Sequence, residues 1–352
     1  MSLGKLATGW GRAVAMAACA WGLGGCSLIP PFCGYTPAIC GADGVAALEK
    51  IDLGGMQQAV LMRGNDVSNP VLLWLHGGPG AAQMPVARHF NGDLERNFVV
   101  VHWDQRGAGL SNPRDFDESS MSVEQFVADT HELTQYLKQR FNTDRIFLLG
   151  HSWGTHIGIE AVSRWPEDYH AYIGVSQLAN TQLAEEIGWS WLRQQSQGTR
   201  RESDVAEIGP PPYVEHDRYV AYARMIESFG GGMDVGMVRL AFAALRAPEY
   251  CMCDYFAWLG GSTRGSGPMW DPEKPFDVFE RAPRLDVPAY FLSGRNDYNT
   301  PGELVEQYYD MLDAPAGKQM IWFENSAHAP FMGEPDKFFQ ELVRISREAG
   351  VR

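Results

Sequence analysis

Short apolar runs alternate with longer segments whose apolar positions recur at helical spacing, both early and late in the chain. Uninterrupted apolar runs of this length are typical of strands that are buried on both faces. A further pair of strands is predicted within 46–63, around Gly54 and Gly55. The predicted buried strands are 71–75, 98–103, 145–149, 172–175, 288–293 and 319–323.

The segments between these runs predict helices. Residues 122–141 place Phe126, Leu133, Leu137 and Phe141 near one face, and Ser122 with Gln125 forms a capping box at the start. Two further helices are predicted over 153–164, before Pro166, and over 336–348. Strands that alternate with helices predict a mostly parallel central sheet with helices on both faces.

This alternation stops between residues 178 and 282. The segment holds several helical patterns, a run of three prolines at 210–212 and three glycines at 230–232, but no apolar run comparable to the earlier strands. We interpret it as an inserted helical cap. The α/β core is then expected to comprise 49–177 and 283–352.

The N-terminus predicts export. The positive residues Lys5 and Arg12 precede an apolar stretch, Ala13–Leu23, that is too short to anchor the chain as a stable membrane span. It ends in Leu23-Gly24-Gly25-Cys26, which resembles a bacterial lipoprotein signal, in which the cysteine is lipidated and becomes the new N-terminus.

We therefore expect residues 1–25 to be a signal peptide and 26–48 to be a tether. The protein is then expected on the periplasmic side of the cell envelope, held at a membrane surface by a lipid on Cys26, and Ser27 favours the outer membrane. The alternative is an ordinary secretory signal with an incidental cysteine.

The remaining cysteines agree with an oxidising compartment. Apart from Cys19 in the signal, they are Cys33, Cys40, Cys251 and Cys253, which favour two disulfides with three alternative pairings. Pairing of Cys33 with Cys40 would close a short loop, whereas a cross-pairing would attach the N-terminal segment to the region of Cys251. No histidine lies close in sequence to either pair, so we expect no metal site.

Charge narrows the range of partners. The formal net charge of the 352 residues is −14 at pH 7, whereas a protein that binds nucleic acid needs a basic face. We expect no nucleic-acid partner. A small molecule or a short peptide remains as the expected ligand.

The chemistry is expected at Ser152. It stands in Gly150-His151-Ser152-Trp153-Gly154, between a predicted strand and a predicted helix. This is the context of a nucleophile elbow, in which a strained turn exposes the serine and small residues avoid crowding.

Asp297 and His328 follow the last two predicted strands. The order Ser152, Asp297, His328 is that of the catalytic triad in α/β-hydrolases, where the histidine is the base and the aspartate orients it. Glu324 and Asp286 are the alternative acids.

The negative tetrahedral intermediate needs backbone N–H donors. The N–H of Trp153, directly after the nucleophile, is one candidate. The second is expected in the loop His76-Gly77-Gly78-Pro79-Gly80 after the strand 71–75, from Gly78 or, failing that, Gly77.

These motifs resemble a known family. The loop 76–80, the run Asp-Gln-Arg-Gly-Ala-Gly-Leu-Ser at 104–111, and Ser152-Trp153-Gly154 are similar to the prolyl aminopeptidase (proline iminopeptidase) group of α/β-hydrolases. The similarity covers the core, about 50–177 and 283–345. It implies removal of N-terminal residues, often proline, without a metal or cofactor, and Trp153 beside the oxyanion hole. His151 departs from the strict proline-specific members, which have glycine there.

The resemblance also implies cap glutamates that hold the free ammonium group of the substrate. We select Glu185 and Glu186, near Trp189 and Trp191, from seven cap glutamates. The expected function is therefore hydrolysis of N-terminal residues from short peptides or aminoacyl amides. The alternatives are an exported carboxylesterase, lactonase or other acyl hydrolase that needs no free amine, and a binding protein with an inactive hydrolase core, which the intact triad disfavours.

Overall fold

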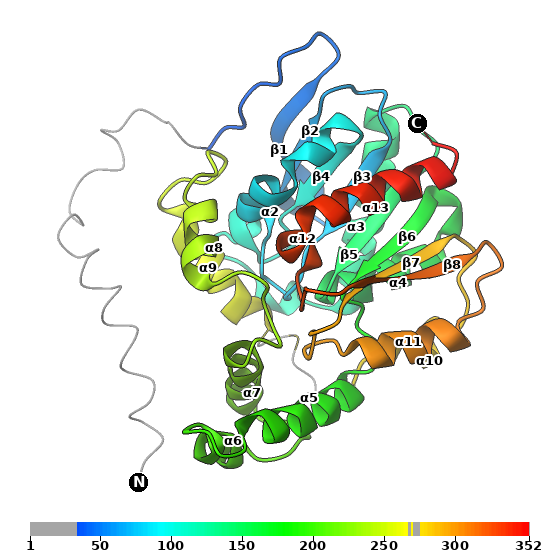
Figure 1. Cartoon of the computed structure of the whole chain (residues 1–352). Coiled ribbons are helices and arrows are strands. Elements are labelled where there is room, and N and C mark those ends of the chain that lie inside the picture. Colours follow the sequence, from blue (N-terminus) through cyan, green and yellow to red (C-terminus); the bar gives the residue numbers. More distant parts are fainter. Residues whose placement is uncertain (1–33, 267–268, 270–274, 352) are drawn as a thin grey trace, which may run out of the picture.

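The structure is a computed structural model that describes residues 34–266, 269 and 275–351. Its centre is an eight-stranded sheet of order β1-β2-β4-β3-β5-β6-β7-β8 (Figure 1). β1 pairs antiparallel with β2 and β2 with β4, while every other pair is parallel. The strands are β1 (Val45–Leu53), β2 (Met56–Gly64), β3 (Val71–Leu75), β4 (Val99–Trp103), β5 (Ile146–His151), β6 (Tyr169–Val175), β7 (Ala289–Gly294) and β8 (Lys318–Phe323).

The predicted strands are confirmed to within a few residues. β1 and β2 meet at Gly54 and Gly55, which both have positive φ, as a tight antiparallel turn requires. β1 begins at Val45, so the first strand starts inside the segment that was expected to be a tether.

Alternate residues of each strand enter two separate cores. In β3, Leu73 and Leu75 join the core beneath α3, α4 and α11, while Leu72 and Trp74 join the core beneath α2 and α13. This is the pattern of a sheet buried on both faces. The helices of the core are α2 (Met84–Asn91), α3 (Val123–Arg140), α4 (Trp153–Arg164), α11 (Gly302–Met311), α12 (Pro330–Gly333) and α13 (Pro335–Glu348), with 3-10 turns η2 (Gly92–Arg96), η3 (Gly109–Ser111), η4 (Glu118–Ser120) and η5 (Pro166–Asp168).

The capping signal that predicted the start of α3 is confirmed. α3 begins after Ser122, whose side chain accepts a hydrogen bond from the N–H of Gln125, as the capping box predicts. The short α2 and the helix α11 were not predicted. α2 begins four residues after the glycine–proline loop 76–80 and carries Pro85 in its first turn. In the sequence, its start is therefore hard to distinguish from a continuation of that loop.

Six helices fall between residues 178 and 282, and no strand lies among the described residues of this insertion. The insertion lies beyond one end of the sheet and along one flank (Figure 1). Leu192, Val205, Tyr213, Tyr222 and Ile226 form a small core of its own. The helices are α5 (Thr181–Ser196), α6 (Glu202–Ile208), α7 (His216–Ser228), α8 (Met237–Ala244), α9 (Asp254–Ser266) and α10 (Val278–Arg281).

The cysteines correct one expectation. Cys251 is disulfide-bonded, but Cys40 is an exposed free thiol, so the four cysteines cannot form two disulfides. The N-terminal segment runs along the loop before α9 instead of folding back on itself, because Tyr35 donates its N–H to the carbonyl of Pro248 (3.3 Å). A Cβ on Gly34 would lie 3.6 Å from the sulfur of Cys251.

The predicted signal peptide, Cys26 and Cys33 lie outside the described residues. Within the described part of the chain, no helix combines the length and the apolar character that are needed to cross a membrane.

The turn around Ser152 generates the first prediction. A Cβ on Gly154 would lie 2.2 Å from the carbonyl oxygen of Leu75, and backbone cannot move aside as a flexible side chain can. We expect Gly154→Ala to lower the free energy of unfolding by about 3 kcal/mol, measured by urea denaturation. Gly260→Ala in α9 is the matched control, because a Cβ there meets no atom within 4 Å. Equal urea midpoints for the two variants would contradict the crowding.

Candidate active site

Ser152 occupies the sharp turn between β5 and α4. Its φ of 52° and ψ of −120° are unusual for a residue with a side chain, and they mark local strain. The turn is held by hydrogen bonds from the N–H of Ser152 to the carbonyl of Val175 (3.0 Å) and from the N–H of Thr155 to the carbonyl of Ser152 (2.8 Å). This is the geometry expected of a nucleophile elbow.

Asp297 and His328 form a buried pair on the loops after β7 and β8. Nδ1 of His328 lies 2.9 Å from Oδ2 of Asp297, and the two residues are only 7% and 2% exposed. The other carboxylate oxygen accepts the N–H groups of Asn299 and Thr300, both at 2.9 Å, and the Thr300 hydroxyl donates to Oδ2 at 2.6 Å. The carboxylate therefore has one fixed orientation toward the imidazole.

The charges of this pair support each other. Burial lowers the pKa of His328, but the Asp297 carboxylate raises it, and the net pKa lies above the usual value. Burial raises the pKa of Asp297, while the charge and hydrogen bond of His328 lower it, and the net pKa lies below the usual value. Asp297 is thus ionised, and its hydrogen bond holds the proton on Nδ1 of His328 and leaves Nε2 as the candidate base.

The alternative acids are used elsewhere. Glu324 pairs with Arg295 at 3.0 Å, and Asp286 pairs with Arg284 at 2.7 Å, with all four side chains largely exposed. In the described part of the chain, Asp297 is the carboxylate that is hydrogen-bonded to the His328 ring, so it is the acid that the fold places there.

His151 connects the elbow to the loop of His328. Its ring lies 5.0 Å from the His328 ring, centroid to centroid, and its Nε2 lies 2.8 Å from the His328 carbonyl oxygen. The hydroxyl of Ser176 donates to the same oxygen at 2.9 Å. The residue next to Ser152 therefore helps to place the base.

A polar chain fixes the tautomer of His151. Burial and the charge of His328 lower the pKa of His151 to about 3, so its ring is neutral. Trp74 donates to the carbonyl oxygen of the Gln83 side chain (3.0 Å), which turns the Gln83 amide nitrogen toward Nδ1 of His151 (2.7 Å). Nδ1 is then an acceptor, and Nε2 donates to His328. No sequence signal identifies Gln83.

The cap holds the same loop from the opposite side. The N–H of His328 donates to the carbonyl of Gly232 at 2.9 Å. The N–H groups of Ala327 and Ala329 donate to the two carboxylate oxygens of Asp234, each at 2.6 Å. Three successive backbone donors around the base are thus accepted by residues of the insertion. We call Gly232 and Asp234 the cap clamp.

The glycine loop packs against the elbow. A Cβ on Gly77 would lie 3.3 Å from Cβ of Ser152, so only glycine allows this approach without displacement. Gly78 has a φ of 125° and precedes a cis peptide bond to Pro79. Of the two candidate donors of the loop, Gly77 therefore lies beside the nucleophile turn, and Gly78 follows it in the chain.

Gln105 connects the glycine loop to Trp153. Its N–H donates to Nε2 of His76 (3.1 Å), and its side-chain nitrogen donates to the His76 carbonyl (3.0 Å). The Trp153 indole donates to the side-chain oxygen of Gln105 at 3.2 Å. The two segments that carry the predicted oxyanion donors are thereby held in register by one side chain of the Asp-Gln-Arg-Gly motif.

The cap glutamates differ in their surroundings. Glu186 is exposed, while Glu185 is half-buried and accepts the N–H of Tyr213 at 3.4 Å. Burial raises the pKa of Glu185 to about 7. Glu227 on α7 lies close enough to His328 for its charge to raise the pKa of the imidazole, and it accepts the N–H of Met233 at 2.6 Å. The structure therefore adds Glu227, which sequence reasoning left unselected.

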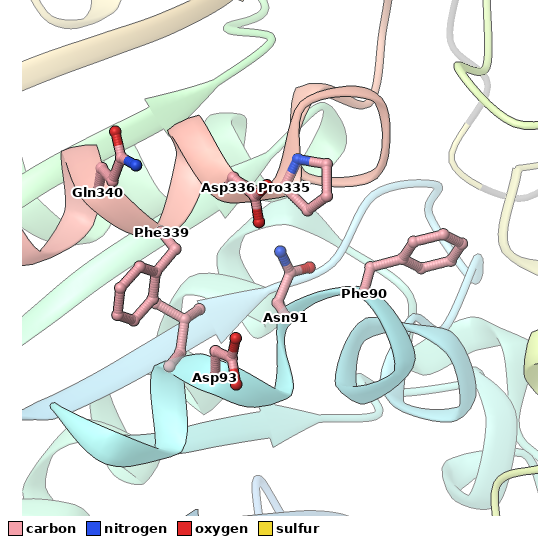
Figure 2. A pocket seen from close by; sticks show the side chains of 8 residues that line it. Phe90, Asn91, Asp93, Pro335, Asp336, Phe339 and Gln340 are labelled. Atoms are coloured by element: carbon pink, nitrogen blue, oxygen red, sulfur yellow. The ribbon is translucent and has the colours of Figure 1, made fainter.

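One hollow of the surface lies apart from the candidate site residues. A hollow of about 230 Å³ opens between α2, η2 and α13 (Figure 2), and none of the predicted site residues lines it. No group of three or more His, Cys, Asp and Glu side chains in the described ranges is arranged to hold a metal ion. The hollow is lined by Phe90, Asn91, Asp93, Leu94, Pro335, Asp336, Phe339 and Gln340.

Comparison with known proteins agrees with this geometry. The family model described as serine aminopeptidase, S33, matches residues 68–199. A probable aminopeptidase of Bacillus subtilis is 34% identical over 309 residues, which cover 86% of this chain and 97% of that protein. The chain belongs to the S33 aminopeptidase family of hydrolases.

Two more distant relatives extend the similarity. A proline iminopeptidase of Heyndrickxia coagulans is 27% identical over 288 residues, covering 78% of this chain and 89% of that protein. The crystal structure of a proline iminopeptidase of Mycobacterium smegmatis matches with a TM-score of 0.60 at 20% identity, covering 86% of this chain and 98% of that one. The predicted α/β-hydrolase fold is confirmed.

The cap clamp of this S33 hydrolase generates the second prediction. Asp234→Asn removes one of two oxygen acceptors and a negative charge that raises the pKa of His328. The His328 pKa should fall, so the unprotonated base should persist to lower pH, while misplacement of the loop should slow the reaction about tenfold. The measurement is the rate of fluorophosphonate labelling against pH.

Asp217→Asn on α7 is the matched control. Asp217 is exposed, so the same loss of charge is screened by water and should leave both the rate and its acidic limb unchanged. A common pH profile and rate for the two variants would remove Asp234 from the positioning of the base.

Proposed function

We propose that this protein is a serine hydrolase that removes the N-terminal residue, with proline among the candidates, from short peptides or aminoacyl amides. The observation that carries the proposal is the buried Asp297–His328 pair, held on a fixed loop beside the strained turn of Ser152. The similarity to a probable aminopeptidase of Bacillus subtilis and a proline iminopeptidase of Heyndrickxia coagulans supports the aminopeptidase reaction.

In the proposed mechanism, Oγ of Ser152 attacks the acyl carbon and gives its proton to Nε2 of His328. The N–H groups of Gly78 and Trp153 stabilise the oxyanion. His328 then protonates the leaving amine, which departs and leaves an acyl-enzyme. Water attacks that ester after giving a proton to His328, and the proton returns to Ser152 as the acid product leaves. Asp297 remains ionised and orients the imidazole throughout.

A free amine would be recognised by a cap carboxylate that is partly shielded from water. Glu227 is our first candidate, because its charge already acts on His328 and an N-terminal ammonium must lie close to the scissile carbonyl. Glu185 is the second, because its half-buried carboxyl has a raised pKa and a bound ammonium would stabilise its charged form. The exposed Glu186 is the weakest of the three.

We also propose that the protein is exported and carries a lipid on Cys26. This rests on the pattern of the N-terminal sequence, with Leu23-Gly24-Gly25 before the cysteine. The disulfide at Cys251 is consistent with an oxidising compartment.

The requirement for a free amine is the third prediction. The chain should hydrolyse a prolyl or alanyl arylamide, and its rate on the N-acetylated twin should fall by about 100-fold or more, because the acetylated compound cannot pair with a carboxylate. Ser152→Ala is the blank for both substrates. Equal rates on the twins, or activity on esters alone, would replace the aminopeptidase with a general acyl hydrolase.

The role of Glu227 is the fourth prediction. Glu227→Gln keeps an oxygen to accept the N–H of Met233 but loses the charge, so KM for the free-amine arylamide should rise at least about tenfold. Turnover of a small aryl ester, which has no ammonium group, should change little. Glu186→Gln is the matched control, and an equal response of the two variants would exclude Glu227 as the amine ligand.

A further inference from the structure

The helices α8 and α9 expose an unusual number of large apolar side chains. Seven of them lie on these helices and the adjoining loop, each between 57% and 72% exposed. Exposed apolar residues elsewhere in the described chain are scattered, as is normal for a monomer. We name the seven residues the α8–α9 face: Met237, Val238, Phe242, Leu245, Met252, Phe256 and Leu259.

The helices that carry this face are packed firmly on their other side. Ala243 and Ala244 of α8 are buried, and the hydroxyl of Tyr255 in α9 donates to the carbonyl of Ala244. The indole of Trp258 donates to the carbonyl of Ala82 at 2.7 Å, directly after the glycine loop. α8 and α9 lie close together at one flank of the molecule (Figure 1). The apolar side chains therefore point outward from a fixed support.

The N-terminal segment is fixed to the loop that joins these two helices. Tyr35 donates its N–H to the Pro248 carbonyl at 3.3 Å, and the Thr36 hydroxyl donates to Glu249 at 3.0 Å. Glu249 is itself buried and pairs with Arg88 at 3.2 Å. Gly34, the first described residue, is consequently held beside the loop that joins α8 and α9.

This attachment limits the distance to a membrane anchor. Cys26 precedes Gly34 by eight residues, and an extended chain spans at most about 3.6 Å per residue, or about 29 Å in all. A bilayer that holds a lipid on Cys26 would thus lie within about 29 Å of the face. The face would be presented to that bilayer at a high local concentration.

We propose that the α8–α9 face docks on the surface of a lipid bilayer, with Phe242 and Phe256 entering the boundary between headgroups and acyl chains. Exposed Arg239 and Arg246 lie on the same helix and the loop after it, where long basic side chains can reach lipid phosphates. Because the chain has a net charge of −14, apolar contact rather than charge attraction provides the binding. The proposal is independent of the hydrolase reaction, and the proposed lipid on Cys26 supplies only the proximity.

The fifth prediction tests the face without the anchor. The mature chain that begins at residue 26, without the predicted signal peptide and with Cys26→Ser, is titrated with vesicles of phosphatidylcholine and phosphatidylethanolamine, and a partition coefficient is obtained by sedimentation. Adding Phe242→Ser and Phe256→Ser should lower it at least about tenfold, because two phenyl rings no longer leave water. Raising the salt from low to high concentration should change it little.

Val214→Ser with Met311→Ser, in the same Cys26→Ser chain, is the matched control. These residues are also exposed and apolar, but Val214 lies on the loop before α7 and Met311 lies on α11. The partition coefficient should therefore stay unchanged. Equal partition by the two double variants would overturn the proposal. A dimer that the phenylalanine variants abolish, without any change in vesicle binding, would overturn it in favour of a second copy of the chain.

The experiment remains interpretable if another proposal fails. Absence of lipid on Cys26 in the wild-type chain would remove the anchor but leave the comparison of the double variants valid. Hydrolysis of the arylamide by both double variants shows that they are folded, and fluorophosphonate labelling serves the same purpose if the substrate is different.

Discussion

The active site depends on the placement of three consecutive backbone N–H groups, those of residues 327 to 329. A catalytic histidine needs a fixed backbone, because its ring must contact both the acid and the nucleophile. Here Gly232 and Asp234 of the insertion accept all three donors, while His151 and Ser176 of the core donate to the carbonyl of His328. The loop is thus held between the core and the insertion, and the insertion contributes directly to the geometry of the candidate active site.

A few contacts also fix the oxyanion side of the candidate active site. The strained turn at Ser152 is tolerated because its neighbours fix it, and the glycine loop can approach because Gly77 has no side chain. Gln105 then bridges the carbonyl and ring of His76 to the indole of Trp153. His76, Gln105 and Trp153 are buried. Loss of one of these partners would therefore leave a buried polar group without a hydrogen bond, and this cost favours a single geometry.

Much of this could be predicted from sequence, and the limits have a physical cause. Ser152, Asp297 and His328 follow strand ends, and a regular α/β order brings strand ends together without any knowledge of side-chain contacts. Asp234 and Gln83 follow no such rule. Asp234 accepts the N–H of Ala327, 93 residues away, and this contact exists only once the insertion has folded onto the core. The expectation of two disulfides was wrong for a similar reason, because disulfide formation depends on where the N-terminal segment is fixed.

The two halves of the insertion have different attachments, and these attachments meet at the site. The α5–α7 half joins the triad, since Trp191 stacks on Tyr298 at 4.1 Å beside Asp297. The α8–α9 half joins the oxyanion side, since Trp258 binds the carbonyl of Ala82 and Tyr250 donates to Asp104 of the motif that contains Gln105. Asp234 of the cap clamp lies only three residues before α8, so a displacement of this helix would act on the loop of His328 as well as on the oxyanion side.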